Sequence, residues 1–186
     1  MHRRDVVRLL GTTLVLPFIP GNSAAAADLG KRLHRHLLDG ADVPFRTLNR
    51  DQQALVTDIA EMIIPETDTP GAKSVKVPEF IDLILSEWAS DEERAAYLAG
   101  LGDIDARASA LGASRFVDLT PARKTELLTT LDRARADKTG AGLAFGQTKS
   151  LTVYGYFTSA PAQQDVLKTQ MFFNGYQGDV PFTPRT

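Results

Sequence analysis

The chain has 186 residues, of which 43% are hydrophobic, and its 21 basic and 23 acidic side chains give a net charge of −2. This composition predicts a globular chain without the basic field that attracts nucleic acid or anionic lipid, so no nucleic-acid partner is expected. The sequence contains no cysteine, which excludes disulfides, thiolate metal sites, iron–sulfur clusters and covalently attached haem.

Residues 1–27 have the three parts of a secretory signal peptide. Arg3 and Arg4 form a basic start, residues 9–19 are moderately apolar, and a run of small residues at 23–27 ends the segment. The arginine pair favours the twin-arginine (Tat) class, which exports folded proteins, so Arg3 and Arg4 are the candidate export signal and the predicted location is periplasmic. The strict motif is not matched at His2 or at Val6-Val7. An ordinary Sec leader, a basic disordered end and an uncleaved leader that anchors the chain are the alternatives.

The chain after the leader is long enough for one domain with a substantial core. Removing Arg3, Arg4, Arg8 and Asp5 with the leader leaves 18 basic and 22 acidic residues, a net charge of −4. Residues 28–47 are charged, with leucines at helical spacing, and are interpreted as an N-terminal helix or a linker. A single helical domain is expected over residues 48–186.

The first helix of this domain is predicted to start at Asn49, which is a good N-cap with Gln52 at the capping-box position. It ends before Pro65, because a proline disfavours helical geometry in the residue that precedes it. Residues 65–72 are dense in turn formers and predict a loop. Pro78 suits the first turn of a second helix, which has the strongest apolar stripe in the chain and is expected to be the most deeply buried: Phe80, Ile81, Ile84, Leu85 and Trp88.

Ser90 and Glu93 form a second capping box, which opens a helix whose apolar positions extend to Leu111. Gly100 and Gly102 each weaken that helix by about 1 kcal/mol relative to alanine. A helix beginning at Pro121 is predicted to be broken by residues 137–142, and another helix is predicted over 143–154. After Gly155 the sequence is irregular and aromatic, with a short helix after Pro161. No segment alternates with period 2, so the predicted fold is all-α: one compact domain of about five to seven helices with an irregular aromatic C-terminal tail.

No residue pattern points to catalysis, to a bound cofactor or to a metal in this chain. Glu66 and Asp68, with Glu61, Glu79 and Asp82 nearby in sequence, could supply oxygen ligands to a hard cation, but their spacing is not that of a calcium loop. His34 and His36 do not share a helix face. The segment that begins at Gly100 lacks the third glycine and the preceding strand of a dinucleotide site.

The aromatic C-terminal third is the candidate partner interface, because tyrosine, phenylalanine and methionine are enriched where proteins meet. The alternative is that Phe157 and some of its neighbours are core residues that pack against a wrapped tail. The candidate residues are Tyr154, Tyr156, Phe157, Phe172, Phe173 and Tyr176.

Several motifs, in the same order, resemble the gluconate 2-dehydrogenase subunit 3 family. The most specific is the loop Pro65-x-Thr67-Asp68-Thr69-Pro70-Gly71-Ala72, which follows Met62-Ile63-Ile64 and precedes Val77-Pro78-Glu79-Phe80. Phe116-x2-Leu119-Thr120-Pro121, Gly155-Tyr156-Phe157-Thr158-Ser159 and Tyr176-x-Gly178 follow in order.

The resemblance implies a non-catalytic small subunit of a periplasmic sugar dehydrogenase complex. Its large subunit is of the glucose-methanol-choline type and binds FAD, a cytochrome c often accepts the electrons, and the complex can associate with the inner membrane. Substrates in such complexes include gluconate, glucose, fructose and glycosides oxidised at C3. The small subunit would act as a folding chaperone and stabilising partner and escort the large one through the Tat translocase. A free-standing periplasmic metal-dependent enzyme and a helical ligand-binding module are the alternative hypotheses.

Overall fold

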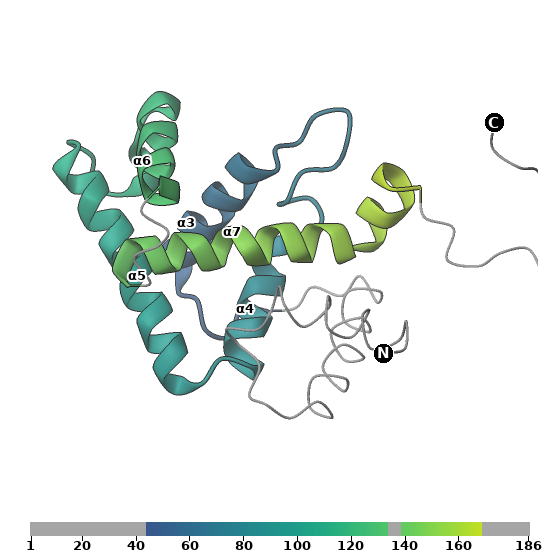
Figure 1. The fold of residues 1–186 in the computed structure, drawn as a ribbon, viewed down its shortest axis with the longest axis horizontal. Helices are drawn as coiled ribbons and strands as arrows, with labels where there is room; N and C mark the ends of the chain where they lie inside the picture. The colour runs from purple at the N-terminus through teal and green to yellow at the C-terminus, as the bar shows by residue number, and fades with distance from the viewer. Residues whose placement is uncertain (1–43, 134–138, 169–186) are drawn as a thin grey trace, which may run out of the picture.

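The computed structural model describes residues 44–133 and 139–168. Within these ranges the chain forms five α-helices, a short 3-10 helix and a π-helix, and no strand, so the predicted all-α fold is confirmed (Figure 1). The leader with Arg3 and Arg4, and residues 28–43, lie outside the described residues. The elements in chain order are α3 (Arg50–Ile63), α4 (Val77–Glu87), α5 (Asp91–Ala110), η2 (Phe116–Asp118), α6 (Pro121–Arg133), α7 (Gly140–Thr158) and η4 (Ala162–Val166).

Both predicted capping boxes are confirmed. At the start of α3, the Asn49 side chain accepts a hydrogen bond from the Gln52 backbone N–H at 2.9 Å, and the Gln52 side chain accepts one from the Asn49 N–H at 3.0 Å. At the start of α5, Ser90 Oγ accepts from the Glu93 N–H at 3.2 Å, and the Glu93 carboxylate accepts from the Ser90 N–H at 2.9 Å. Each box satisfies backbone donors that a helix N-terminus would otherwise leave unpaired.

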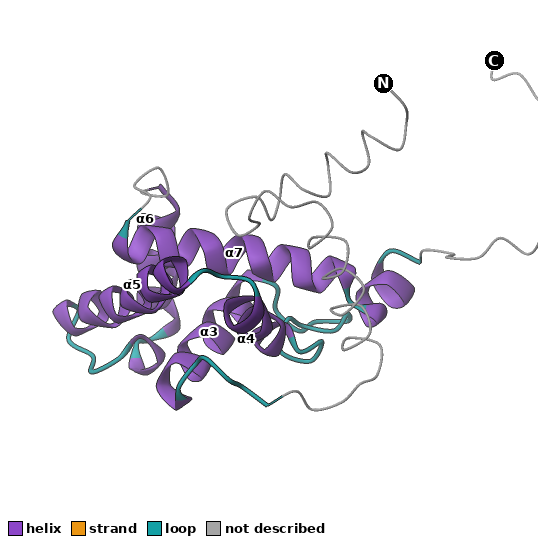
Figure 2. Cartoon of the chain, turned by 90° about the horizontal axis from the view of Figure 1, so that it is seen from below, coloured by secondary structure: helices purple, strands orange, loops and turns teal. Residues whose placement is uncertain are grey.

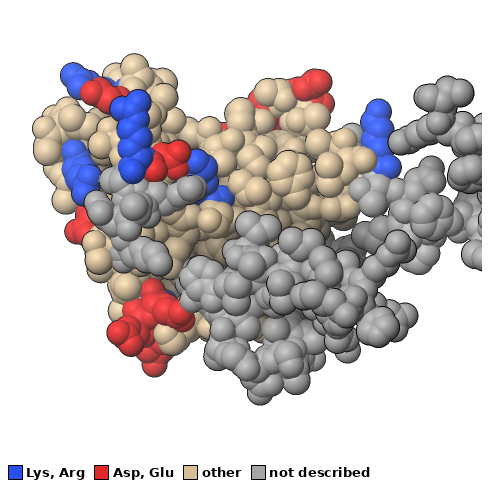
Figure 3. Space-filling model, viewed as in Figure 1, with Lys and Arg blue, Asp and Glu red and all other residues tan. Residues whose placement is uncertain are grey.

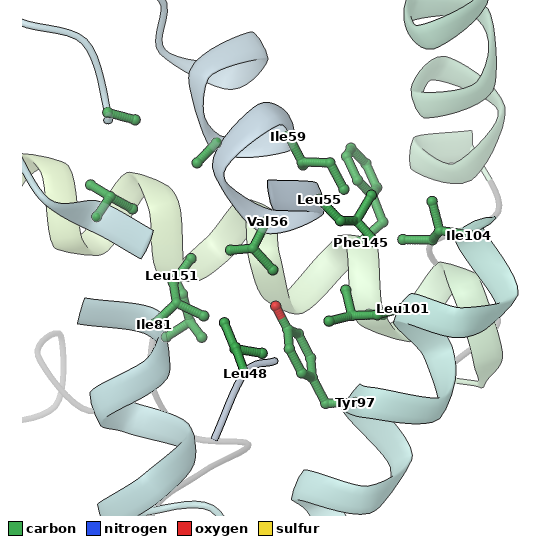
Figure 4. Close-up of a cluster of buried hydrophobic side chains, with 14 of the residues drawn as sticks. Leu48, Leu55, Val56, Ile59, Ile81, Tyr97, Leu101, Ile104, Phe145 and Leu151 are labelled. Carbon is green, nitrogen blue, oxygen red and sulfur yellow. The ribbon is translucent and has the colours of Figure 1, made fainter. Parts of the chain in front are cut away.

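Helix α7 is the element against which the other helices pack. It contacts α3, α4, α5 and α6, and Figure 2 shows it as an outer layer with α3 and α4 beneath it. The prediction that the helix after Pro78 is deeply buried is confirmed, since eight of the 11 residues of α4 are buried. Figure 4 shows the centre of the core, where side chains from α3, α4, α5, α7 and the segment before α3 meet: Leu48, Leu55, Val56, Ile59, Ile81, Tyr97, Leu101, Ile104, Phe145 and Leu151.

Two glycines allow α7 to approach its neighbours closely. A Cβ atom at Gly100 of α5 would lie 2.5 Å from the Gly140 carbonyl oxygen and 2.7 Å from Ala144 Cβ. A Cβ atom at Gly155 of α7 would lie 2.6 Å from the ring of Phe80 on α4. Because real Cβ atoms do not approach other atoms this closely, both helix contacts require glycine.

The predicted boundaries of the last long helix were wrong at both ends. Residues 140–142, predicted to belong to a break, are the first turn of α7, and residues 155–158, predicted to be irregular, are its last turn. Glycine and β-branched residues lower the intrinsic helix preference of this segment, but its packing against four other helices outweighs that preference.

Leu111, predicted on the buried face of α5, caps its C-terminus and is 38% exposed. Within the described ranges, no helix combines the length and apolar character needed to cross a membrane.

Candidate partner interface

The loop between α3 and α4, which carries the most specific family motif, is tied to the helices at its base. The Glu61 carboxylate of α3 accepts hydrogen bonds from the backbone N–H groups of Glu66, at 2.8 Å, and Lys73, at 2.9 Å. The Tyr156 hydroxyl of α7 donates to the Pro70 carbonyl oxygen at 2.8 Å. Gly71 lies directly against this base, where an added Cβ would be 2.5 Å from the Glu61 carboxylate. These contacts therefore tie the base of the loop to α3 and α7.

Three of the five acidic residues considered as cation ligands, Glu61, Asp68 and Asp82, have other partners. The Asp82 side chain is 2% exposed, and its carboxylate accepts hydrogen bonds from three consecutive backbone N–H groups, those of Arg46, Thr47 and Leu48, at 2.7, 3.0 and 2.7 Å. Asp68 accepts a hydrogen bond from the Thr67 hydroxyl. Among the described residues, no group of three histidine or acidic side chains is arranged to hold a metal ion. The carboxylates of Asp68 and Asp82 thus accept hydrogen bonds that stabilise loops.

An open groove of about 430 Å³ lies along the outer side of α3 and the start of α4. Its lining combines the apolar residues Phe45, Ala54 and Pro78 with side chains of both charges. Two of the carboxylates in the lining are already paired, because Glu61 holds the loop and Asp58 lies 2.6 Å from the Lys124 ammonium. The groove therefore contains no arrangement that identifies a reaction.

The structure describes three of the aromatic residues predicted as a partner interface, and each has a different degree of exposure. Tyr156 is 2% exposed, so in this structure its ring belongs to the core, as the alternative interpretation had it. Phe157, which the alternative placed in the core, is 39% exposed, so the alternative is wrong for this residue. Its ring meets that of Tyr156 edge-on, with the centroids 5.2 Å apart. Tyr154 lies between these extremes; its ring centroid is 6.0 Å from that of Phe80, and its partial burial raises its pKa above the ordinary tyrosine value. Phe172, Phe173 and Tyr176 lie outside the described residues.

Two features were missed from sequence. Val153, one turn before Phe157 on α7, is 38% exposed. The available signal was the almost complete lack of charge over residues 140–158. Inside the fold, the Tyr97 hydroxyl lies 2.8 Å from Thr148 Oγ1, which itself donates to the Ala144 carbonyl oxygen. Tyr97 is therefore the donor in its pair, and burial raises its pKa well above the ordinary value.

Comparison with known proteins identifies a family for most of this fold. Residues 50–175 match the family model described as gluconate 2-dehydrogenase subunit 3, over a range that includes every helix from α3 to η4. No match was found among curated proteins or among solved structures. The family description names a subunit, which implies a multi-subunit dehydrogenase complex. The match covers more than half of the chain and confirms the resemblance noted in the sequence. The chain therefore belongs to the gluconate 2-dehydrogenase subunit 3 family.

Proposed function

We propose that this chain is the non-catalytic small subunit of a periplasmic sugar dehydrogenase whose large subunit is an FAD-binding flavoprotein of the glucose-methanol-choline type. The observation that carries the proposal is the family match over residues 50–175, since the family is defined as a subunit of a gluconate-oxidising enzyme. The substrate class is a sugar or a sugar acid. The flavin and the catalytic residues belong to the partner, and a cytochrome c is the further candidate subunit that would accept the electrons.

The chain also acts, in this proposal, as the escort that exports the flavoprotein. Arg3 and Arg4 begin a leader of the Tat type. The Tat route accepts folded cargo, and the flavin that must be inserted before export is bound by the partner. A large subunit without a leader of its own would cross the inner membrane only while bound to this chain. The same association would stabilise the flavoprotein as it folds in the cytoplasm.

The escort role is tested by producing both subunits in a bacterial host and measuring the flavoprotein in periplasmic and cytoplasmic fractions. Replacing Arg3 and Arg4 together by lysine keeps the charge but removes the arginine pair, and should leave both subunits in the cytoplasm. The matched control is Arg8→Lys, which makes the same chemical change outside the pair and should leave export unchanged. Normal export of the flavoprotein with the double variant, or in the absence of this chain, would contradict the proposal.

The stabilising role has a separate readout in the cytoplasm. The flavoprotein is produced with and without this chain in a strain that lacks the Tat translocase, and the soluble, flavin-loaded fraction is measured by flavin absorbance. The proposal predicts a larger flavin-loaded fraction when the chain is present. Equal fractions would limit the function of the chain to export.

A further inference from the structure

The outward side of α7 is almost free of charge. Lys149 is the one charged residue among the 19 of α7, and it pairs with Asp132 at 2.8 Å, whereas α5 has seven charged residues among 20. Figure 3 shows this as an uncharged area in the middle of the face on which α7 lies, with charged side chains gathered toward the α5 and α6 side. At 100° per residue, the outward residues share one arc of the helix; we call them the α7 stripe: Leu143, Gly146, Gln147, Ser150, Val153, Tyr154 and Phe157.

A helix with so few charged residues is normally buried on most of its surface. The inner side of α7 is in the core, but on its outer side Val153 and Phe157 are 38% and 39% exposed. A surface helix that faced only water would carry charged residues at such positions, as α5 does. Interface centres have this composition, because they are depleted in charge and enriched in aromatic side chains.

We propose that the α7 stripe is the centre of the surface that binds the flavoprotein subunit; this inference rests on the function proposed above. The partner surface opposite the stripe should be uncharged and rich in aliphatic and aromatic side chains, because a charge buried there would find no counter-charge on α7. The family match supports this choice of partner, since it makes the chain a subunit and spans the whole of α7.

The size of the α7 stripe argues against a dimer of this chain held together by two stripes alone. Fourteen steps of helix make it about 21 Å long, and a helix is about 10 Å wide, so the stripe covers roughly 200 Å². Two such stripes facing each other would bury about 400 Å² in total, whereas stable interfaces bury at least about 1,200 Å². A stable interface centred on the stripe must therefore also include the surface that flanks it.

The absence of cysteine from the chain allows a direct test. The variants are Val153→Cys in the α7 stripe and Leu111→Cys at the end of α5, two apolar residues with the same 38% exposure. Maleimide labelling rates are measured for the purified chain and for the purified complex with the flavoprotein. Both thiols should react at similar rates in the free chain. In the complex, labelling at position 153 should slow at least tenfold while labelling at position 111 does not change.

Four other results would overturn the inference, and they separate it from the proposed function. Undiminished labelling at position 153 in an intact complex would overturn the α7 stripe as the binding surface but leave the proposed function standing. Protection in the free chain that rises with its concentration would assign the stripe to a second copy. Protection in the free chain that disappears when residues 169–186 are removed would assign it to the chain's own C-terminal segment. Failure of the unmodified chain to form a complex with the flavoprotein would overturn the proposed function itself.

Discussion

Two glycines of α5 provide a sensitive test of how α5 packs against α7. By intrinsic helix preference alone, Gly100→Ala and Gly102→Ala should each stabilise the fold by about 1 kcal/mol, since both replace glycine inside a helix. The structure separates the two positions. A Cβ atom at position 102 meets nothing within 4 Å, whereas one at position 100 would lie 2.5 Å from the Gly140 carbonyl oxygen and 2.7 Å from Ala144 Cβ.

The expected magnitude follows from these distances. Carbon atoms in contact normally stand about 3.5–4.0 Å apart, so α5 and α7 would have to separate by about 1 Å to admit the new methyl group at position 100. Forcing extra atoms into a well-packed core typically costs about 1–3 kcal/mol. After the gain in helix preference, Gly100→Ala should leave the free energy of unfolding unchanged or lower it by up to about 2 kcal/mol. Gly102→Ala should raise it by up to about 1 kcal/mol.

The assay is urea unfolding followed by far-UV circular dichroism, with the unmodified chain and both variants at one protein concentration. The quantity compared is the transition midpoint at constant slope, because a changed slope would mean that the folded or unfolded ensemble itself had changed. A difference of about 1–3 kcal/mol between the two variants is expected. Equal stabilisation by both substitutions would refute the close approach of the two helices and the role assigned to Gly100.

Three further predictions concern buried or bridging polar groups. Asp82→Asn should lower the free energy of unfolding by about 2–4 kcal/mol, because one of three charge-assisted hydrogen bonds is lost and the other two weaken. Urea midpoints measure this loss, and the control is the exposed Asp68→Asn, which should change the free energy of unfolding by no more than about 0.5 kcal/mol. Glu61→Gln should speed amide exchange at Lys73 about tenfold, equivalent to about 1.4 kcal/mol, and unchanged exchange would exclude Glu61 as the anchor of the loop. Burial raises the pKa of Tyr97 in the folded chain, so as the pH rises this hydroxyl ionises in the unfolded chain before it does in the folded one. Its ionisation should therefore lower the free energy of unfolding only above about pH 10, by up to about 1.4 kcal/mol per pH unit. Urea midpoints at about pH 9 and pH 11 should fall less for Tyr97→Phe than for the unmodified chain.

Features that depend on neighbouring residues could be predicted from the sequence, and features that depend on distant ones could not. The capping boxes at Asn49 and Ser90 each involve residues three positions apart, so the pattern itself contains both partners. The ends of α7 depend instead on contacts with α4 and α5, such as that of Gly155 with Phe80, which local sequence does not contain. Asp82 was considered as a cation ligand because its three backbone partners lie 34 to 36 residues earlier in the chain.

The same limit explains the partial agreement at the candidate interface. The aromatic residues near Gly155 were grouped by their closeness in sequence, but on a helix, adjacent residues point about 100° apart. Tyr156 therefore turns into the core while Phe157 turns outward, and Val153, one turn earlier, shares the outward side. Only the knowledge that residues 155–158 are helical assigns these side chains to opposite sides.

The motif that most clearly marks the family and the surface proposed to bind the partner are different parts of the molecule, joined through α7. The base of the loop is held by internal contacts, since Glu61 accepts hydrogen bonds from the Glu66 and Lys73 N–H groups and Tyr156 donates to the Pro70 carbonyl oxygen, whereas residues 65–68 are exposed. Tyr156 lies beside Phe157 of the α7 stripe, so the contact that positions the loop also fixes the C-terminal end of α7. The contacts at the base of this loop can in this way support partner binding, because they help to position the helix that carries the α7 stripe.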